Sequence, residues 1–231
     1  MNALIQQENN LIGSKTEIEN LSKKEEAKIL LLSDSHGAKN LVREILIQNA
    51  PKVNALAFCG DGSYDIASLF EESFENEQIK NLLPPVIAMV RGNGDSPNCI
   101  VSFDTKTGIK DSDFHKLNVP GEILFSVAKK TIFMAHGNKQ GVYYGSSYLK
   151  DFAQELGANI AFFGHTHIPY ESNQNVYLIN PGSVGSPRAS SPYSFAIVEI
   201  TQKSVNAIFY KTELKNEKVE FVPYFPENYS F

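Results

Sequence analysis

Hydrophobic and polar positions in the first half of the chain alternate between short apolar runs and amphipathic segments. Residues 28–33 (KILLLS) form a continuous apolar run, which is typical of a parallel strand buried on both faces. In the next segment, Leu41, Val42, Ile45 and Leu46 follow a helical spacing that Pro51 ends. The pattern then repeats, with a strand, an acidic helical segment and another strand expected at 55–58, 64–82 and 86–90. Strands that alternate with helices predict an α/β fold whose parallel sheet is covered on both faces.

The second half of the chain is richer in strand patterns. Apolar runs at 123–127 and 131–135, joined by three residues, predict a hairpin, and a helix is expected from Ser147 to Leu156, ending at Gly157. Residues 96–118 show no clear period, and we interpret them as a loop or short helix that could serve as a lid. Further strands are expected at 160–163, 176–179, 195–200 and 205–209.

Bulk properties indicate one domain. Residues 1–27 are polar and carry none of the candidate chemistry, so we interpret them as an N-terminal extension of a domain that spans 28–231. No apolar run approaches the ~20 residues that span a bilayer, and the N-terminus lacks a secretory pattern. Cys59 and Cys99 are the only cysteines and do not suggest a disulfide framework, so a cytoplasmic protein with no membrane partner is expected.

Candidate chemistry follows the apolar runs. Four of the five histidines lie in short motifs directly after such runs, and acidic or amide residues flanked by glycine follow others. In α/β sheets, the turns at the carboxyl ends of strands are where ligands bind, so residues remote in sequence can converge there. The motifs are Asp34-Ser35-His36, Gly60-Asp61-Gly62, Gly92-Asn93-Gly94-Asp95, Ala135-His136-Gly137 and Gly164-His165-Thr166-His167.

These residue types fit a site for two divalent metal ions. A carboxylate has two oxygens, which suits Asp61 to bridging ions roughly 3.5–4 Å apart. Asp34 and Asp61 would neutralise only part of the metal charge while histidine and asparagine stay neutral, so the cluster would attract an anion. Nitrogen and oxygen ligands favour Mn, Fe, Ni or Zn over Ca. The net charge of −5 gives no general attraction to nucleic acid.

Taken in order, the five motifs resemble those of the calcineurin-like metallophosphoesterases. Their spacing, with Asn180-Pro181-Gly182-Ser183 afterwards, is most similar to the small YfcE-type phosphodiesterases of that superfamily. The resemblance covers roughly residues 28–210. It implies a four-layer α/β/β/α sandwich in which two mixed sheets pack face to face.

The resemblance also implies a ligand set and a mechanism. Asp61, Asn93 and His136 would be the catalytic residues, with a metal-bridging hydroxide attacking phosphorus in line with the leaving group. Manganese is the expected metal, with nickel, zinc or iron as alternatives. One ion would be held by Asp34, His36, Asp61 and His167, and the other by Asp61, Asn93, His136 and His165.

One position departs from the wider superfamily, in which many members have a histidine that protonates the leaving group. This chain has Gly94 there. A general acid contributes about 10²–10⁴-fold, so its absence disfavours esters with poor leaving groups. We therefore expect a phosphodiesterase that acts on small organic or nucleotide-like esters. The alternatives are a phosphomonoesterase and an idle protein-binding scaffold, like the retromer subunit that resembles this family.

Five further residues are weaker candidates for supporting or substrate-binding roles. Asp95 is expected to orient the loop or a metal ligand, and His115 is either a replacement acid or a solvated loop histidine. Arg91 and Arg188 could bind phosphate oxygens or form surface ion pairs, and Ser183 could contact substrate from a structural turn. The aromatic cluster at 143–148 either walls a pocket or packs in the core or a dimer interface, so a homo-oligomer is a possible partner.

Overall fold

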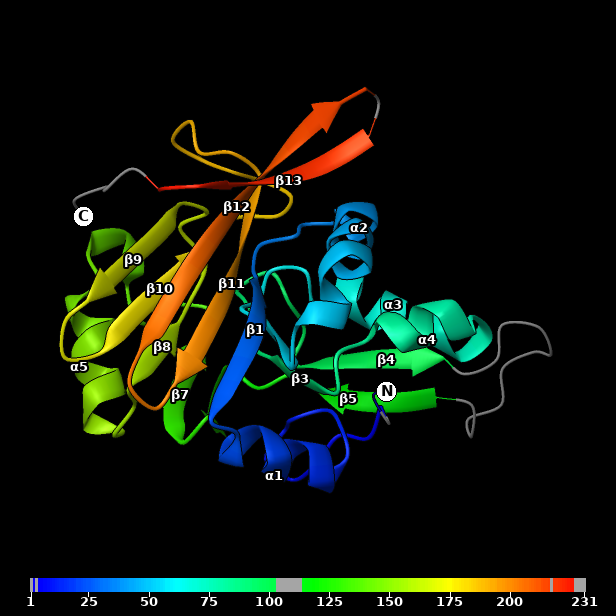
Figure 1. Ribbon diagram of the computed structural model, residues 1–231, viewed down its shortest axis with the longest axis horizontal. Helices are drawn as coiled ribbons and strands as arrows, with labels where there is room; N and C mark the ends of the chain where they lie inside the picture. Colours follow the sequence, from blue (N-terminus) through cyan, green and yellow to red (C-terminus); the bar gives the residue numbers. More distant parts are fainter. Residues whose placement is uncertain (1, 3, 103–113, 217, 227–231) are drawn as a thin grey trace.

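Two mixed β-sheets pack face to face in the computed structural model, which describes residues 2, 4–102, 114–216 and 218–226 (Figure 1). The first sheet has six strands in the order β13-β12-β11-β1-β2-β3. Its strands are β1 (Glu26–Leu32), β2 (Ala55–Phe58), β3 (Val86–Met89), β11 (Ser194–Thr201), β12 (Val205–Lys215) and β13 (Lys218–Tyr224). The strands β1, β2 and β3 are parallel, whereas β11 to β13 are antiparallel additions to the β1 edge.

The second sheet has five strands in the order β6-β7-β8-β10-β9. Its centre is parallel, because β8 pairs in parallel with both β7 and β10, and its two edge strands are antiparallel. Its strands are β6 (Glu122–Val127), β7 (Lys130–Ala135), β8 (Ile160–Phe162), β9 (Pro169–Asn173) and β10 (Tyr177–Pro181).

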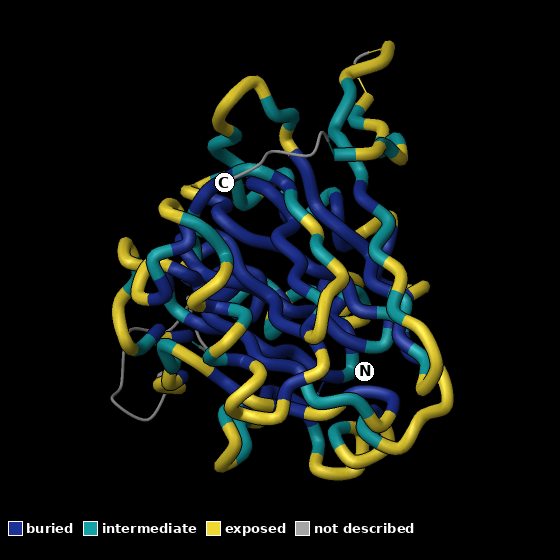
Figure 2. The backbone as a smooth tube through the Cα atoms, turned by 90° about the vertical axis from the view of Figure 1, so that its left-hand side faces the viewer, coloured by how far each residue is buried: buried dark blue, intermediate teal, exposed yellow. Residues whose placement is uncertain are grey.

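Alternating side chains of the central strands fill the layers on both sides of each sheet. In β1, Ile29 and Leu31 lie in the core between the sheets, whereas Leu30 and Leu32 face the helices. All four side chains are 0% exposed, and burying each one contributes roughly 1.5–3 kcal/mol. The strand β7 is divided in the same way between the central core and the outer core over the second sheet. The central strands are accordingly the dark interior of Figure 2.

Helices cover the outer faces of both sheets. The outer core of the first sheet is packed by α2 (Lys39–Asn49) and α3 (Ser63–Glu75), and that of the second by α5 (Ser147–Glu155). The predicted four-layer α/β/β/α sandwich with two mixed sheets is therefore confirmed. Pro51 lies in a 3₁₀ turn, η1 (Ala50–Lys52), at the predicted end of α2. Among the described residues, no helix combines the length and apolarity needed to cross a membrane.

Several expected elements differ from those observed. The interpretation of 96–118 as a loop or short helix is wrong at both ends, where β4 (Asn98–Ser102) and β5 (Phe114–Asn118) form an antiparallel pair. The strand β4 alternates, with Cys99 and Val101 buried and Ile100 exposed. Residues 103–113, and with them any lid, lie outside the described residues.

Other differences are local. The single helical segment expected at 64–82 is divided into α3 and α4 (Glu77–Leu82), because Asn76 ends the first and caps the second by accepting from Gln78 N–H. The strands β9 and β13 were not predicted.

The N-terminal segment packs on the layered body. It contains α1 (Lys15–Lys23), begun by a Ser14 side chain that accepts from Glu17 N–H. Leu21 is buried in the central core, and Ile12 pairs with Ile87 beside β3 through two backbone hydrogen bonds of 2.8 Å. The segment expected as an extension therefore contributes side chains to the core.

Candidate metal centre

The candidate ligands lie at the carboxyl ends of strands from both sheets. Because the two sheets pack face to face, these ends meet at one place. From the first sheet, Asp34, Asp61 and Asn93 follow β1, β2 and β3; from the second, His136 follows β7, and His165 and His167 follow β8.

Five of the seven candidate ligands have a backbone conformation that is rare for side-chain-bearing residues. The left-handed region, with φ between about 40° and 70°, is disfavoured outside glycine and concentrates at functional sites. The φ values are 54° for Asp34, 43° for His36, 55° for Asp61, 68° for His165 and 61° for His167. Sequence patterns gave no sign of this strain, because none of the five residues is glycine.

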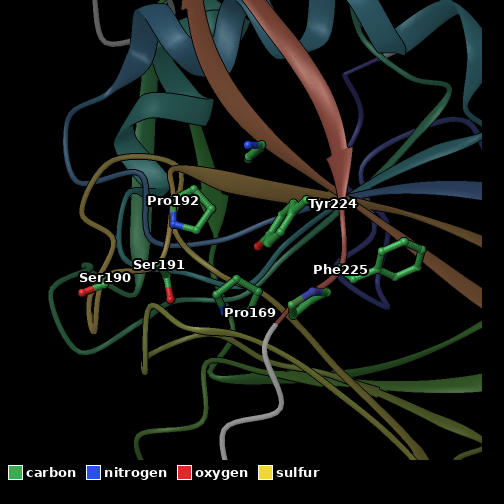
Figure 3. A pocket seen from close by; sticks show the side chains of 8 residues that line it. Pro169, Ser190, Ser191, Pro192, Tyr224 and Phe225 are labelled. Carbon is green, nitrogen blue, oxygen red and sulfur yellow. The ribbon is translucent and has the colours of Figure 1, made fainter.

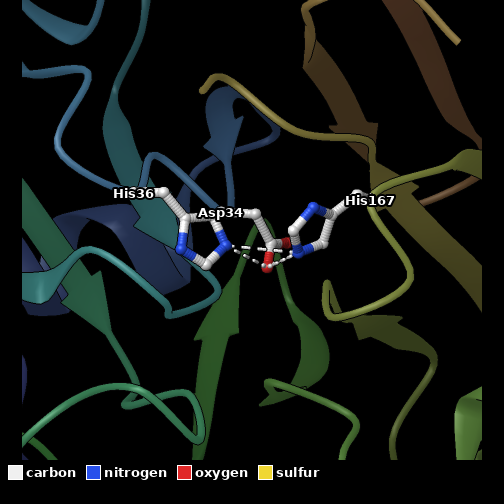
Figure 4. A group of neighbouring side chains, drawn as sticks. All are labelled: Asp34, His36 and His167. Carbon is white, nitrogen blue, oxygen red and sulfur yellow. Dashed lines mark hydrogen bonds and ion pairs between the residues drawn. The ribbon is translucent and has the colours of Figure 1, made fainter. Parts of the chain in front are cut away.

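A first group brings together Asp34, His36 and His167 (Figure 4). The Nε2 atom of His167 lies 3.1 Å from Asp34 Oδ1, and that of His36 lies 3.8 Å from the same oxygen. The two Nε2 atoms are 3.2 Å apart. The donor atoms of this group all lie within 4.8 Å of one another, which leaves room for one cation among them.

A second group shares Asp34 with the first and adds Asp61 and His136. The Nε2 atom of His136 lies 3.5 Å from Asp61 Oδ2 and 3.9 Å from Asp34 Oδ1. His165 is adjacent, with its Nδ1 atom 3.2 Å from His136 Nε2. Asp61 also lies near the first group, since its Oδ2 is 3.9 Å from His36 Nε2. The two carboxylates are therefore placed between the two groups.

Hydrogen bonds fix which nitrogen of two histidines faces the centre. The Nδ1 atom of His136 donates to the carbonyl of Cys59 at 2.7 Å, and that of His167 donates to the carbonyl of Ser186. A carbonyl oxygen can only accept, so in the neutral rings Nε2 carries the lone pair. Both lone pairs therefore point toward carboxylate oxygens.

This convergence fits a divalent cation. Asp34 Oδ1 is buried and makes no hydrogen bond, although imidazole nitrogens surround it. Buried polar atoms are nearly always satisfied, so an unsatisfied oxygen facing nitrogen lone pairs indicates a cation-binding centre. The nitrogen and oxygen donors suit a transition metal, and the two groups together are consistent with a dinuclear site.

The pKa values of the centre reflect the same attraction for cations. Burial raises the pKa of Asp61, but the interaction with His136 and the hydrogen bond from Gly94 N–H outweigh it and lower that pKa to about 2. Burial lowers the pKa of His136, but Asp61 and Asp34 outweigh it and raise that pKa. The pKa of His167 is raised by Asp34 in the same way. Burial and the neighbouring His136 lower the pKa of His165.

Surrounding groups hold the two carboxylates in place. The second oxygen of Asp34 accepts from the Ser33 hydroxyl at 2.6 Å and from His165 N–H at 3.0 Å. Asp95 accepts from four backbone N–H groups, those of Asp61, Gly62, Ser63 and Gly92, at 2.7–3.0 Å. It therefore ties together the turns after β2 and β3.

Two glycines leave space for the carboxylates. A Cβ atom at Gly92 would lie 2.0 Å from Asp61 Oδ1, and one at Gly164 would lie 2.6 Å from Asp34 Oδ2. Such distances are far below van der Waals contact, so each glycine is required by the side chain beside it. The reading of these glycines as sites of close approach is consistent with this geometry.

The remaining proposed ligand, Asn93, and the weaker sequence candidates occupy different positions. Asn93 is exposed in the turn after β3, while Arg91 donates from Nη1 to the Val119 carbonyl at 3.0 Å. Ser183 is 0% exposed, and its hydroxyl donates to the backbone carbonyl of Asp34. His115 is exposed on β5, in register with Val101. The structure thus gives Ser183 a contact with a ligand's backbone, which the sequence could not show.

Arg188 and Tyr143 lie against the centre. The Arg188 guanidinium lies 5.6 Å from the centre of the Tyr143 ring, which packs edge-on against His165. A cavity of about 360 Å³ is lined in part by the residues that follow Arg188 in this loop (Figure 3). None of its lining residues belongs to the Asp/His groups; they are Pro169, Ser190, Ser191, Pro192, Lys211, Tyr224, Phe225 and Pro226.

Known proteins resemble this chain in sequence and in fold. The probable metallophosphoesterase YsnB of Bacillus subtilis strain 168 is 28% identical over 183 residues, covering 79% of this chain and 89% of YsnB. A predicted phosphoesterase of Streptococcus pneumoniae TIGR4 matches with a TM-score of 0.57 at 23% identity, over 86% of this chain and 98% of that structure. Vacuolar protein sorting 29 of Cryptosporidium parvum also matches with a TM-score of 0.57, at 19% identity over 88% and 100%.

A family model provides the assignment that these similarities support. The model of the calcineurin-like phosphoesterase superfamily domain matches residues 27–203, which includes every candidate ligand. The chain therefore belongs to the calcineurin-like phosphoesterase superfamily and is a probable metallophosphoesterase.

Proposed function

We propose that this protein is a dinuclear metal-dependent hydrolase of phosphodiester bonds. The observation that carries the proposal is the pair of Asp/His groups that share the unsatisfied Asp34 Oδ1. Two divalent ions, when bound there, supply Lewis acidity and activate water for in-line attack on phosphorus. Asp34, His36, Asp61 and His167 are the proposed ligands of one ion, and Asp61, Asn93, His136 and His165 those of the other.

The residues themselves explain the preference for an anionic substrate. Asp34 and Asp61 are the only carboxylates in the two groups, and the histidines bind metal in their neutral form. Two dications with two carboxylates leave the centre net positive. A phosphodiester, with one negative charge, is attracted to this centre although the whole chain carries a charge of −5.

Gly94 supports a diester substrate. A Cβ atom at this position would lie 3.3 Å from Asp61 Oδ1, so any side chain there would project beside the metal centre. The chain thus lacks a proton donor at a position that adjoins the proposed catalytic carboxylate. Diesters with stabilised leaving groups need this donor less than monoesters of alkyl alcohols do. A phosphomonoesterase is therefore the second candidate.

Fold similarity does not distinguish a hydrolase from a protein-binding scaffold, so the residues of the metal centre must distinguish them. The phosphoesterase and the vacuolar sorting protein match this fold with the same TM-score. What favours catalysis here is that every ligand position of the five motifs holds a residue able to bind metal. We propose small organic or nucleotide-like diesters as substrates, and manganese as the metal, with nickel, zinc or iron as alternatives.

The test is hydrolysis of bis(p-nitrophenyl) phosphate and p-nitrophenyl phosphate by metal-stripped protein reloaded with Mn²⁺, Ni²⁺ or Zn²⁺. The proposal expects metal-dependent release of p-nitrophenol that is faster from the diester, with about two ions bound per chain by elemental analysis. Metal-loaded protein without activity between pH 6 and 9 would instead favour the scaffold. Faster turnover of the monoester would favour the phosphomonoesterase.

A further inference from the structure

Arg188 is an exposed cation held at the edge of the metal centre. Its guanidinium lies over the Tyr143 ring, 5.6 Å from the ring centre. In the described part of the chain, no carboxylate forms an ion pair with it, whereas Arg43 pairs with Glu72 at 3.2 Å. Arg188 therefore keeps its hydrogen-bond donors available to a ligand.

The backbone around Arg188 is a strained turn. Ser191 N–H donates to the Arg188 carbonyl at 2.9 Å, and the two central residues, Ala189 and Ser190, have φ values of 50° and 60°. Two successive positive φ values are the geometry of a type I′ turn, which glycine and asparagine normally occupy. Alanine and serine hold it only where surrounding structure over-determines the turn, and such strain concentrates at functional sites.

The loop that carries this turn is bonded to the metal ligands. Gly185 N–H and the Ser183 hydroxyl both donate to the Asp34 carbonyl, at 3.1 and 2.7 Å. The Ser186 carbonyl accepts from His167 Nδ1, as described above. Ligands from both sheets thus fix the position of the loop, and the distance from Arg188 to the centre is set by the fold.

Tyr143 contacts both the arginine and the ligand candidate His165. It belongs to the 3₁₀ turn η3 (Val142–Tyr144), which is flanked by Gly141 and Gly145 at positive φ. Its ring packs edge-on against His165, with 4.7 Å between ring centres and 75° between planes. The Tyr143 residue is 43% exposed, so it lies at the protein surface together with the exposed Arg188.

From this geometry we propose that Arg188 binds the non-bridging phosphate oxygens of the substrate, and that Tyr143 is a positioning residue for its guanidinium. The inference rests on the proposed function, because the ligand group is a phosphate at the metal centre. A guanidinium offers a planar fork of donors that matches two phosphate oxygens, and an aromatic face orients it at little entropic cost. Arg188 thereby adds a fixed cation to the charge of the metal ions.

The test measures binding of inorganic phosphate to Mn²⁺-loaded full-length protein by calorimetry, without turnover. Arg188→Ala is expected to raise the phosphate Kd roughly tenfold to a hundredfold, and Arg188→Lys to raise it less, because the fork is lost while the charge remains. Lys203→Ala is the control, since it removes one exposed positive charge from the turn after β11. Elemental analysis verifies that every variant retains its metal.

Tyr143 is tested by a double-mutant cycle. Tyr143→Phe keeps the ring and should leave the Kd unchanged, whereas Tyr143→Leu should raise it several-fold in wild type but not in the Arg188→Ala background. Equal effects of Tyr143→Leu in both backgrounds, or loss of metal in that variant, would overturn the positioning role. An Arg188→Ala protein that matches Lys203→Ala would overturn the phosphate role.

The outcome is independent of the proposed function's own test. If the wild-type protein hydrolyses no phosphodiester but binds phosphate through Arg188, the proposed function fails and the inference stands. If hydrolysis is observed and phosphate binding is unchanged in Arg188→Ala, the inference fails alone. Wild-type protein that binds no phosphate would also overturn it.

Discussion

Replacing Gly92 with alanine tests whether the backbone holds Asp61 where the metal centre needs it. The added Cβ would lie 2.0 Å from Asp61 Oδ1 and 2.6 Å from both its Cγ and its backbone nitrogen. Ordinary contact starts at 3.4 Å, so the carboxylate must move by about 1.4 Å. Metal–ligand distances tolerate only about 0.2 Å, and the backbone clash prevents relief by side-chain rotation alone.

The expected result is a loss of metal affinity of about 10- to 100-fold or more, together with a stability loss of roughly 1–3 kcal/mol in the metal-free protein from overpacking. Mn²⁺ titration of metal-stripped protein by calorimetry measures the first, and urea unfolding measures the second. The same substitution elsewhere provides a graded control. A Cβ added at Gly94 would lie 3.3 Å from Asp61 Oδ1. A Cβ added at Gly121 would lie 3.8 Å from its nearest neighbouring atom, which is ordinary contact.

Gly121→Ala should therefore bind metal like wild type, and Gly94→Ala should be affected slightly. A folded Gly92→Ala protein that binds Mn²⁺ with the affinity of Gly121→Ala would refute the claim that Gly92 keeps the Asp61 carboxylate in position for the metal. Asp61 would then not need its observed position to bind metal.

Three further predictions follow from the same geometry. Asp61→Ala should lose both metals, because its carboxylate lies near both groups, and unchanged metal content by elemental analysis would contradict the bridging role. Gly94→His should raise turnover of an alkyl monoester such as glycerol phosphate, measured as phosphate release, by supplying a proton donor for its basic leaving group, up to about 10²-fold; a flat rate would leave protonation to water. Metal affinity should fall as the pH drops, and the fall should begin above pH 6.5, since the raised pKa values of His136 and His167 make protons stronger competitors than for an ordinary histidine. Calorimetric Mn²⁺ titrations at pH 5.5, 6.5 and 7.5 check the sign, and a constant affinity would exclude these imidazoles as ligands.

Much of the fold could be predicted because the central strands have unambiguous patterns. Residues 29–32 are apolar at every position, and the structure buries alternate residues of this run in two different cores. The β4–β5 pair was missed because only Cys99, Val101 and Leu117 of its described side chains are buried, too few to show a period among polar neighbours. Edge strands such as β13 bury little on either face, so their sequences resemble those of loops.

The candidate site was predicted as a set of side chains, but its organisation depends on backbone atoms. The carbonyl groups of Cys59 and Ser186 fix the tautomers of His136 and His167, and a carbonyl leaves no trace in residue type. The contact of Tyr143 with His165 could not be derived either, since it depends on how the turn after β7 meets the turn after β8. The position of Gly92 against Asp61, by contrast, has a sequence signal, because only glycine fits there.

The strain at the centre requires the core that surrounds it. A residue other than glycine that adopts the left-handed backbone conformation costs roughly 1 kcal/mol or more of folding free energy. Five candidate ligands adopt this conformation. Together they cost several kcal/mol, a sizeable part of the 5–15 kcal/mol that is typical of a domain. The strain is held because these turns directly follow strands such as β1, whose apolar side chains from Ile29 to Leu32 are fully buried. These turns hold the nitrogen and oxygen lone pairs of the candidate ligands close together, where they repel one another. A bound cation offsets this repulsion, so metal binding should stabilise the fold as well as enable catalysis.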